Sequence, residues 1–436
     1  MNVRRLVVLA IVCTFFMTMI SLTSGVQGVQ DARSSSATFL GDGQNSKNPQ
    51  VAVDNNGNAV AVWEEWEVGS DHWSIYSARY SSGAWGAAKL IDNGAYPAHN
   101  PEVAMDGKGT AIAVWEQFDG AYFSIYSAHY SSGAWGTAKL IETAAGDALD
   151  SQIAMDSNGN AMVVWKQSDG AQVHIYSARY SAGHWGTPKM IDTGVGDSYY
   201  PQIAMDDHGN AVAVWMHFGL PTDNNIFVNR YSAGAWGTAR AIKTGTGTAY
   251  DPQIAMDGKG TAITVWQQND GAHFSIYASR YSAGVWARAK VIETAPGDAA
   301  TPQIAMDSNG NGVAVWQQYD GAHFSIYSNR YAAGHWGTAK LIETGATNAD
   351  DPQVAMDSNG NAEVVWVQSD SSGQNCIVAN RCSSGAWGKA GAIETVIGDA
   401  SIPQVAMSDN GRAVVVWRQG GVTPYAIYAT SMTMMH

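Results

Sequence analysis

Charged residues are scarce in this chain of 436 residues: they make up 14% of it, whereas an ordinary soluble domain has roughly 25%. Hydrophobic residues make up 45%, which excludes the low hydrophobicity and high charge of a disordered protein. The 24 Lys and Arg against 38 Asp and Glu give a net charge of −14. Because the sequence has no concentrated basic patch to offset this charge, we expect no nucleic-acid partner.

Long hydrophobic runs are absent except at the N-terminus. Arg4 and Arg5 precede an apolar run from Leu6 to about Leu22, which small and polar residues follow. This pattern is typical of a secretory signal peptide, and about 17 apolar residues are short for a membrane span. We predict a cleaved signal peptide over residues 1–28. The mature chain would then have no membrane span and would be secreted, periplasmic or held at the cell surface.

Cysteine is also rare, with three in the chain, one of them inside the predicted signal peptide. Cys376 and Cys382 lie six positions apart on what we interpret as one strand, which would separate their Cα atoms by about 20 Å. A disulfide needs about 4.4–6.8 Å, and two such thiols do not make a zinc site. We therefore expect two free thiols and no metal or cofactor.

One motif is repeated eight times in the remainder of the chain. The phrase PQIAMD, or a close variant, begins near positions 49, 101, 151, 201, 252, 302, 352 and 403, and each copy continues into an apolar run that ends in Trp. The third copy predicts strands at 152–155, 161–165, 174–180 and 188–193, with turn residues between them. Neither face of these strands alternates with polar residues, so both faces should be covered. We predict an all-β, eight-bladed β-propeller of four-stranded antiparallel blades that forms one domain over residues 29–436.

The two ends of the chain predict how the ring closes. The eighth copy stops after its third strand, whereas residues 36–42, near the N-terminus, match the pattern of a fourth strand. We expect this segment, with Phe39 and Leu40, to be the outer strand of the last blade, so that no sheet edge is left unpaired there. We expect the closed ring to be a monomer.

The repeat unit resembles a known group of propellers. "PQIAMDSNGNAMVVW" is similar to the P-x-x-A-x-D-x-x-G-N-A pattern of exported bacterial propeller repeats, and "YSAGHW" resembles a degenerate Asp-box of sialidase-type propellers, with Ser181, Gly183 and Trp185 but without the Asp. The resemblance covers the mature chain and implies the fold. Proteins of this broad class with known roles include sialidases and sugar-binding lectins.

Three sets of repeated side chains are interpreted mainly as structural. We expect the loop tryptophans to pack against their blades, although they could stack on sugars. We expect the acids after strand one to form Asx turns and not to bind calcium. We expect the arginines of strand three to make salt bridges, either between blades or to strand four. The three sets are Trp85, Trp135, Trp185, Trp236, Trp286, Trp336 and Trp387; Asp54, Asp106, Asp156, Asp206, Asp257, Asp307 and Asp357; and Arg79, Arg179, Arg230, Arg280, Arg330 and Arg381.

Aromatic and acidic residues gather in the loops from strand two to three and from strand four to the next blade, which emerge on one face. Rings that stack and acids that accept hydroxyl hydrogen bonds are the usual composition of a carbohydrate site, although the same residues could be turns and blade plugs. The predicted ligand contacts are Phe118, Asp119, Tyr122, Phe123, Asp270, His273, Phe274, Tyr319, Asp320, His323 and Phe324, and the same face should also carry His174, Tyr199, Tyr200, Tyr250 and Asp169.

The first copy departs from the repeat and contains the densest group of acids with a His. Glu64, Glu65, Glu67, Asp71 and His72 are weak candidates for acid–base catalysis, because paired carboxylates could cleave a glycosidic bond. Three hypotheses stay open: an exported, non-catalytic protein that binds a glycan or an extracellular protein surface; a glycoside hydrolase or lyase of sialidase-like architecture; and a structural repeat of an envelope or matrix.

Overall fold

The computed structural model describes residues 33–34, 36–41, 45–142, 144–192, 196–219, 224–394, 396, 398–421 and 424–433. The chain divides into two compact units, residues 1–30 and 31–436, and all described residues belong to the second. The predicted signal peptide and Asp42 lie outside the described residues. Among those described, no helix has the length and apolar character needed to cross a membrane.

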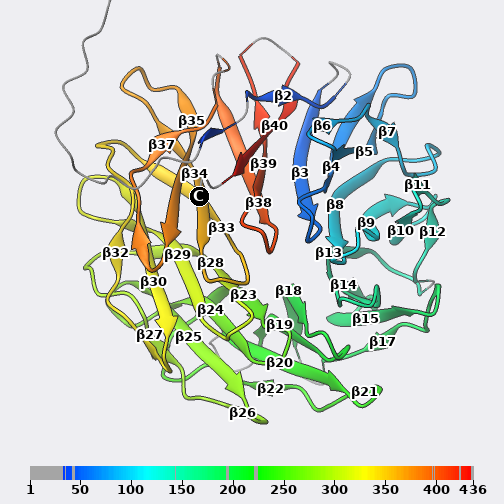
Figure 1. The fold of residues 1–436 in the computed structure, drawn as a ribbon. Helices are drawn as coiled ribbons and strands as arrows, with labels where there is room; N and C mark the ends of the chain where they lie inside the picture. The colour runs from blue at the N-terminus through cyan, green and yellow to red at the C-terminus, as the bar shows by residue number, and fades with distance from the viewer. Residues whose placement is uncertain are drawn as a thin grey trace, which may run out of the picture. The chain divides into compact units, whose positions relative to one another are not determined.

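The described residues form eight antiparallel sheets, which follow one another around a ring as the blades of a β-propeller (Figure 1). Each blade has three long strands and an outer strand in two short segments. The innermost, first strands are β3 (Ser46–Val53), β8 (Ala98–Met105), β13 (Ala148–Met155), β18 (Asp197–Met205), β23 (Ala249–Met256), β28 (Ala299–Met306), β33 (Ala349–Met356) and β38 (Ala400–Met407).

The second and third strands are long and mostly buried. The second strands are β4 (Ala59–Glu67), β9 (Ala111–Phe118), β14 (Ala161–Ser168), β19 (Ala211–Phe218), β24 (Ala262–Asn269), β29 (Gly312–Tyr319), β34 (Ala362–Ser369) and β39 (Ala413–Gln419). The third strands are β5 (His72–Ser81), β10 (Phe123–Ser131), β15 (Val173–Ser181), β20 (Asn224–Ser232), β25 (Phe274–Ser282), β30 (Phe324–Ala332), β35 (Asn375–Ser383) and β40 (Ala426–Thr433).

The outer strand of each blade pairs with the third strand as two short segments. These pairs are β6 (Ala84–Trp85) and β7 (Lys89–Leu90); β11 (Ala134–Trp135) and β12 (Lys139–Leu140); β16 (His184–Trp185) and β17 (Lys189–Met190); β21 (Ala235–Trp236) and β22 (Arg240–Ala241); β26 (Val285–Trp286) and β27 (Lys290–Val291); β31 (His335–Trp336) and β32 (Lys340–Leu341); β36 (Ala386–Trp387) and β37 (Gly391–Ala392); and, in the last blade, β1 (Arg33–Ser34) and β2 (Thr38–Phe39).

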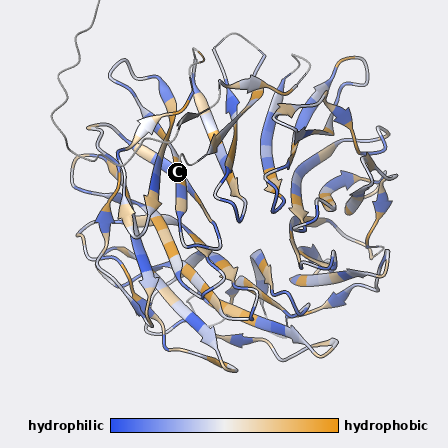
Figure 2. Ribbon diagram, in the orientation of Figure 1, coloured by the Kyte–Doolittle hydropathy of each residue, from blue (hydrophilic) through white to orange (hydrophobic). Residues whose placement is uncertain are grey.

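The hydrophobic core lies between neighbouring blades. The Trp near the middle of each second strand is fully buried, and in the third blade its indole nitrogen donates to the Gln167 side chain at 2.9 Å. One core cluster joins Val114 of blade 2 to Trp165 of blade 3. Figure 2 shows hydrophobic segments along the strands of the blades. Both faces of the second strands are covered, as predicted, and burial of each such large side chain stabilises the fold by roughly 1.5–3 kcal/mol.

The N-terminal segment closes the ring as predicted. In β2, Thr38 and Phe39 pair with Ala429 and Tyr428 of β40, and the Leu40 amide donates to the Ile427 carbonyl at 2.9 Å. The side chain of Leu40 enters the core between the last blade and the first. Ring closure therefore uses one strand from each end of the described chain.

The turns from strand one to strand two all lie on one face of the ring, which we call the turn face. In blade 3 the Asp156 carboxylate accepts hydrogen bonds from the amides of Asn158 and Asn160, at 2.8 and 2.9 Å, and from the Asn160 side chain at 2.8 Å. Gly159 follows with φ 80°, in the left-handed region that glycine enters without a steric penalty. These buried acids form Asx turns, as predicted.

The loop tryptophans and the strand-three arginines also lie near the turn face. Most loop tryptophans pack on the strand-three Tyr of their own blade, with ring centroids 5.4 Å apart for Tyr80 and Trp85, which confirms the packing prediction. The arginines do reach the next blade, but the predicted salt bridges, between blades or to strand four, were wrong. Arg79 lies over the Tyr130 ring at 4.9 Å, whereas among the described residues Arg381 alone of the set pairs with a carboxylate, that of Glu363 in its own blade at 3.5 Å. A cation over an aromatic face is attracted by the ring quadrupole, so no carboxylate is needed.

Cys376 and Cys382 both lie on β35 and are free, as predicted. Burial raises the pKa of the Cys376 thiol to about 11, helped by the charge of Glu394. Burial also raises the pKa of Cys382. Both sulfur atoms are therefore protonated at neutral pH.

Candidate functional site

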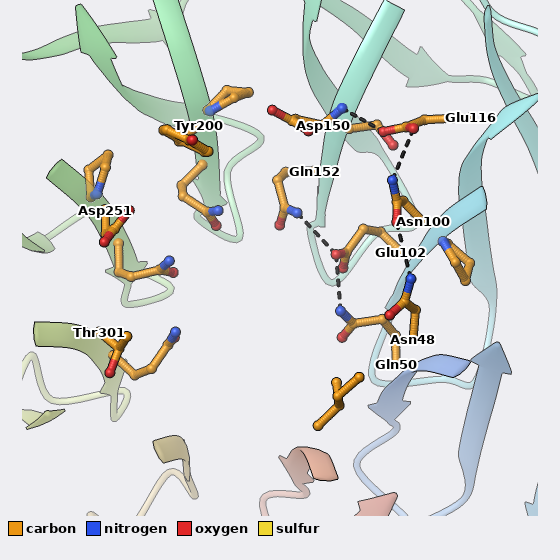
Figure 3. A pocket seen from close by; sticks show the side chains of 18 of the residues that line it. Asn48, Gln50, Asn100, Glu102, Glu116, Asp150, Gln152, Tyr200, Asp251 and Thr301 are labelled. Carbon is orange, nitrogen blue, oxygen red and sulfur yellow. Dashed lines mark hydrogen bonds between the residues drawn. The ribbon is translucent and has the colours of Figure 1, made fainter. Parts of the chain in front are cut away.

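A cavity of 470 Å³ opens where the first strands converge, and we call it the central cavity (Figure 3). Apart from Glu116 of β9, its residues come from the beginnings of the first strands, which pair with the ends of the second strands. It therefore lies on the face opposite the turn face, together with the strand-two to strand-three loops. We call this side the cavity face.

A β-bulge near the beginning of each first strand shapes the rim of the cavity. In blade 2, His99 pairs with Glu116 and Glu102 pairs with Val114, so that Asn100 and Pro101 stand opposite a single residue. Asn100 has φ 50°, and its counterparts in the other blades have φ between 49° and 55°. Residues before proline favour extended backbone, and left-handed backbone is unfavourable for most side chains, so each bulge holds a costly conformation.

The side chain at the bulged position changes in chemistry from copy to copy. The position carries amides, acids, a phenol, a hydroxyl and one aliphatic side chain, although the Pro-Gln that follows is nearly constant. Around the ring the bulged residues are Asn48, Asn100, Asp150, Tyr200, Asp251, Thr301, Asp351 and Ile402. Tyr200 is 51% exposed, and all but Asp351 line the cavity.

In blades 1 to 3 these residues belong to a hydrogen-bonded network. Glu64 is fully buried and accepts from the Asn48 side chain at 2.6 Å and from the Asn100 amide at 3.0 Å. The Asn100 side chain donates to Glu116 at 3.0 Å, and Glu116 also accepts from the Asp150 amide at 2.6 Å (Figure 3). The carboxylates of two neighbouring blades are thus linked through one asparagine.

The two acids of this network have opposite pKa shifts. Burial acts to raise the pKa of Glu64, but hydrogen bonds from His99 at 2.8 Å and from Asn100, together with the charge of Lys47 at 3.2 Å, hold that pKa below its usual range. Burial raises the pKa of Glu116 to about 7. At neutral pH Glu64 is therefore ionised, whereas Glu116 is divided between its charged and neutral forms.

Deeper in the cavity, the second residue after each bulged position is Gln in every copy except the second, where it is Glu102. The Glu102 carboxylate accepts from the Gln50 and Gln152 side chains of the two adjacent blades, each at 3.0 Å (Figure 3). Burial raises the pKa of Glu102 to about 8, helped by the charge of Glu116. One acid that exchanges its proton near neutral pH therefore lies in a ring of amides.

The loop acids predicted as ligand contacts cap their own turns. The Asp119 carboxylate accepts from the amides of Ala121 and Tyr122, at 2.8 and 2.9 Å, and Asp270 and Asp320 do the same. These hydrogen bonds lower the pKa of Asp119. His273 and His323 lie 3.8 and 3.5 Å from the turn acids of their own loops.

The loop aromatics form pairs on the cavity face. Phe118 and Phe123 have centroids 5.7 Å apart, and Tyr319 and Phe324 are 5.5 Å apart, so these rings partly plug their own blades. Phe274 packs on Tyr250 at 6.0 Å. Tyr122 is 43% exposed. Their use as ligand contacts stays a prediction.

The candidate acids of the first blade do not converge on one point. Glu64 turns toward blade 2, whereas Glu65 lies on the other face of β4 and accepts from the Trp63 indole at 2.6 Å. Glu67 accepts from the Tyr76 hydroxyl. His72 contacts Ser70 at 3.0 Å, and Asp71 lies in the turn before it. Of the five, Glu64 belongs to the network beside the central cavity.

The rim of bulged residues was missed by the sequence analysis, except for Tyr200. A signal was present, since the residue before Pro-Gln changes in nearly every copy. Strict strand alternation does not show that this residue faces the cavity, because the bulge breaks that alternation. Among the described residues, no group of three or more His, Cys, Asp or Glu is placed to hold a metal ion.

Comparison with known proteins supports the fold. No family model and no curated protein matches the chain. Solved structures with a similar fold include an ulvan lyase, which is a polysaccharide lyase, with a TM-score of 0.51, 11% identity, and coverage of 91% of this chain and 95% of that one. A protein of unknown function from Dyadobacter fermentans has a TM-score of 0.48, 10% identity, and coverage of 94% and 100%. A Hadza microbial sialidase has a TM-score of 0.39, 12% identity, and coverage of 89% and 66%. At 11% identity, the likeness to the ulvan lyase shows the fold alone.

Proposed function

We propose that this chain is an exported, non-catalytic glycan-binding protein whose main site is the central cavity. The observation that carries the proposal is the rim of bulged residues: of the eight equivalent positions, seven line one cavity, and together they carry several different polar groups, one exposed phenol and one aliphatic side chain. Amides can donate hydrogen bonds to sugar hydroxyls and accept them, carboxylates accept them, and an aromatic ring can stack on a sugar face. Such sites combine a few placed polar groups with a concave surface.

The charge of the rim favours one class of glycan. Asp150 and Asp251 line the cavity together with Glu116, which is partly ionised at neutral pH, and the whole chain carries a net charge of −14. A negative cavity repels sulfated and uronate-rich polymers. The preferred ligand is therefore a neutral or amine-bearing oligosaccharide.

A glycan array that contains neutral, amine-bearing, sulfated and uronate oligosaccharides tests this proposal. We expect retention of neutral or amine-bearing glycans, and at least a tenfold loss of affinity in Tyr200→Ala. The double variant Tyr122→Ala with Phe123→Ala distinguishes binding at the central cavity from binding at the loop aromatics. Both residues lie where the strand-two to strand-three loop of blade 2 meets β10. Loss of binding in this double variant, with Tyr200→Ala unaffected, would move the site to the loops. An array without any retained glycan would refute the proposal.

Cleavage of the bound glycan is a second candidate, favoured by the Glu64–Asn100–Glu116 arrangement. A buried acid with a pKa of about 7 beside an ionised one could serve general acid–base catalysis at neutral pH. Incubation of each retained glycan with the protein, followed by mass spectrometry of the products, distinguishes the two candidates. Shortened products that disappear in Glu116→Gln would establish an enzyme.

A further inference from the structure

The junction between blades 2 and 3 differs from its counterparts. At four junctions an arginine of strand three lies over the last tyrosine of strand three in the next blade: Arg79 over Tyr130, Arg179 over Tyr231, Arg230 over Tyr281 and Arg280 over Tyr331, at 4.9 to 5.7 Å. Blade 2 has His129 at this position, and its ring lies 5.4 Å from that of Tyr180. An imidazole is shorter and smaller than the arginine side chain that it replaces.

A wider groove accompanies this exchange. The cavity between blades 2 and 3 measures 630 Å³, whereas the corresponding cavity beside Arg79 measures 450 Å³ and the one beside Arg330 measures 360 Å³. The wide cavity is lined by the rings of Trp135, Tyr180 and Trp185. We call it the blade 2–3 groove. It belongs to the outer part of the ring and shares no lining residue with the central cavity.

The aromatic rings of the groove are held in place. The Trp185 indole nitrogen donates across the junction to the Ser127 hydroxyl at 2.9 Å, and the Trp185 ring meets Tyr180 edge-on at 5.4 Å. Trp135 packs in the same way on Tyr130, at 5.4 Å. Both indoles are only half-buried, so a part of each stays accessible. Rings that are fixed before binding lose little conformational entropy when a ligand arrives.

The polar groups of the groove are hydroxyls, one amine and two imidazoles. Ser131, Thr137, Lys139 and His184 are exposed at its edge, and its described lining contains no carboxylate. Burial lowers the pKa of His129, which is therefore neutral at physiological pH. The groove thus combines flat apolar rings with hydrogen-bonding groups and has little fixed charge.

We propose that the blade 2–3 groove is a second binding site, which takes a single neutral hexopyranose ring. The apolar face of the sugar would stack on an accessible indole, and its hydroxyls would bond to the groups at the edge of the groove. In the corresponding cavities of two other junctions, the side chain of Arg79 or Arg330 occupies the space that a sugar would take here. This site is independent of the central cavity and does not rest on the proposed function.

His129→Arg tests the proposal, because it restores the side chain of the other junctions. Binding is measured by saturation-transfer NMR and tryptophan fluorescence with three probes: the methyl β-glycosides of glucose, galactose and N-acetylglucosamine. We expect saturable binding of at least one probe by the wild-type protein and at least a tenfold loss of affinity in His129→Arg. Thermal stability should stay the same or rise, because the arginine regains its stacking on Tyr180.

Arg179→His is the matched control, since it should open the next junction and raise the number of sites per chain from one to two. Val285→Ala, at an exposed position of β26 in blade 5, should bind like the wild type. Saturable binding that survives in His129→Arg combined with Tyr200→Ala, in which the central cavity is also disabled, would overturn the proposal. So would the absence of saturable binding of all three probes, whatever glycan the central cavity retains on the array.

Discussion

The two faces of the ring are built from the same eight repeats but use them differently. On the turn face the Asx turns are nearly identical in seven copies, and each buried Asp satisfies the backbone of its own turn. On the cavity face, the bulged position has the same backbone in every copy and a side chain that changes from Asn to Asp, Tyr, Thr and Ile. The repeat is therefore kept where a side chain holds the backbone and varies where it faces open space.

The largest effect should follow removal of a turn-face acid. Asp206 accepts from the amides of His208 and Asn210, at 3.0 and 2.8 Å, and from the Asn210 side chain at 2.7 Å. Asp206→Ala leaves these donors without a partner and should lower the free energy of unfolding by about 2–4 kcal/mol. Urea denaturation measures the change. Asp351→Asn, at an exposed bulged position whose left-handed backbone Asn also tolerates, should stay within about 0.5 kcal/mol of the wild type, and an equal loss in both would abolish the distinction between the faces.

A pH-dependent effect on stability should come from Glu102, which lies among the glutamine side chains of the central cavity. The pKa of Glu102 is raised in the folded protein to about 8, so its contribution to stability is complete below its ordinary pKa of 4.5 and is lost as the pH rises through about 8. Glu102→Gln should therefore be more stable than the wild type by about 1–3 kcal/mol at pH 9 and equal to it at pH 4.

Thermal unfolding across this pH range checks the prediction. Gln253→Glu, which adds a second carboxylate among these glutamine side chains, is the opposing control and should lose stability at high pH. A Glu102→Gln difference that does not change with pH would assign the effect to packing.

A smaller gain should come from relief of backbone strain on the cavity face. Ile402 has φ 53° and is β-branched, and left-handed backbone costs such a residue about 1–2 kcal/mol. Ile402→Asn, the residue of the first two blades, should raise the free energy of unfolding by about 0.5–1 kcal/mol. The reverse change, Asn48→Ile, should destabilise, because it also removes the 2.6 Å hydrogen bond to Glu64. Chemical denaturation of both variants decides the sign.

The smallest effect on stability is expected for Tyr200→Ala, since that side chain is 51% exposed. Its free energy of unfolding should stay within about 0.5 kcal/mol of the wild type while glycan retention falls. Differential scanning calorimetry of the same protein samples that are used on the array measures the stability of each variant beside its glycan retention. A collapse of stability would show that Tyr200 supports the rim instead of contacting a ligand.

Much of the architecture could be predicted from the repeated pattern. The buried tryptophans, the Asx turns and the completion of the last blade by Phe39 and Leu40 all follow from local rules of burial, turn chemistry and edge pairing. The limits of the strands were less accurate. In the third copy the first strand was predicted over 152–155, but it begins at Ala148, because the chain continues through the bulge before it pairs again.

The sequence by itself determined a ring of eight repeats, since each copy has strands too apolar to be stable alone and turns that return the chain. Tertiary structure decided which side chains share a space. Asn100 joins Glu64 to Glu116 only because a bulge turns it toward its neighbours, and His129 widens a groove only because Trp135 and Trp185, 50 positions apart, stand on adjacent blades. Such meetings depend on the bulges and on the packing of one blade against the next, which a periodic sequence pattern does not encode.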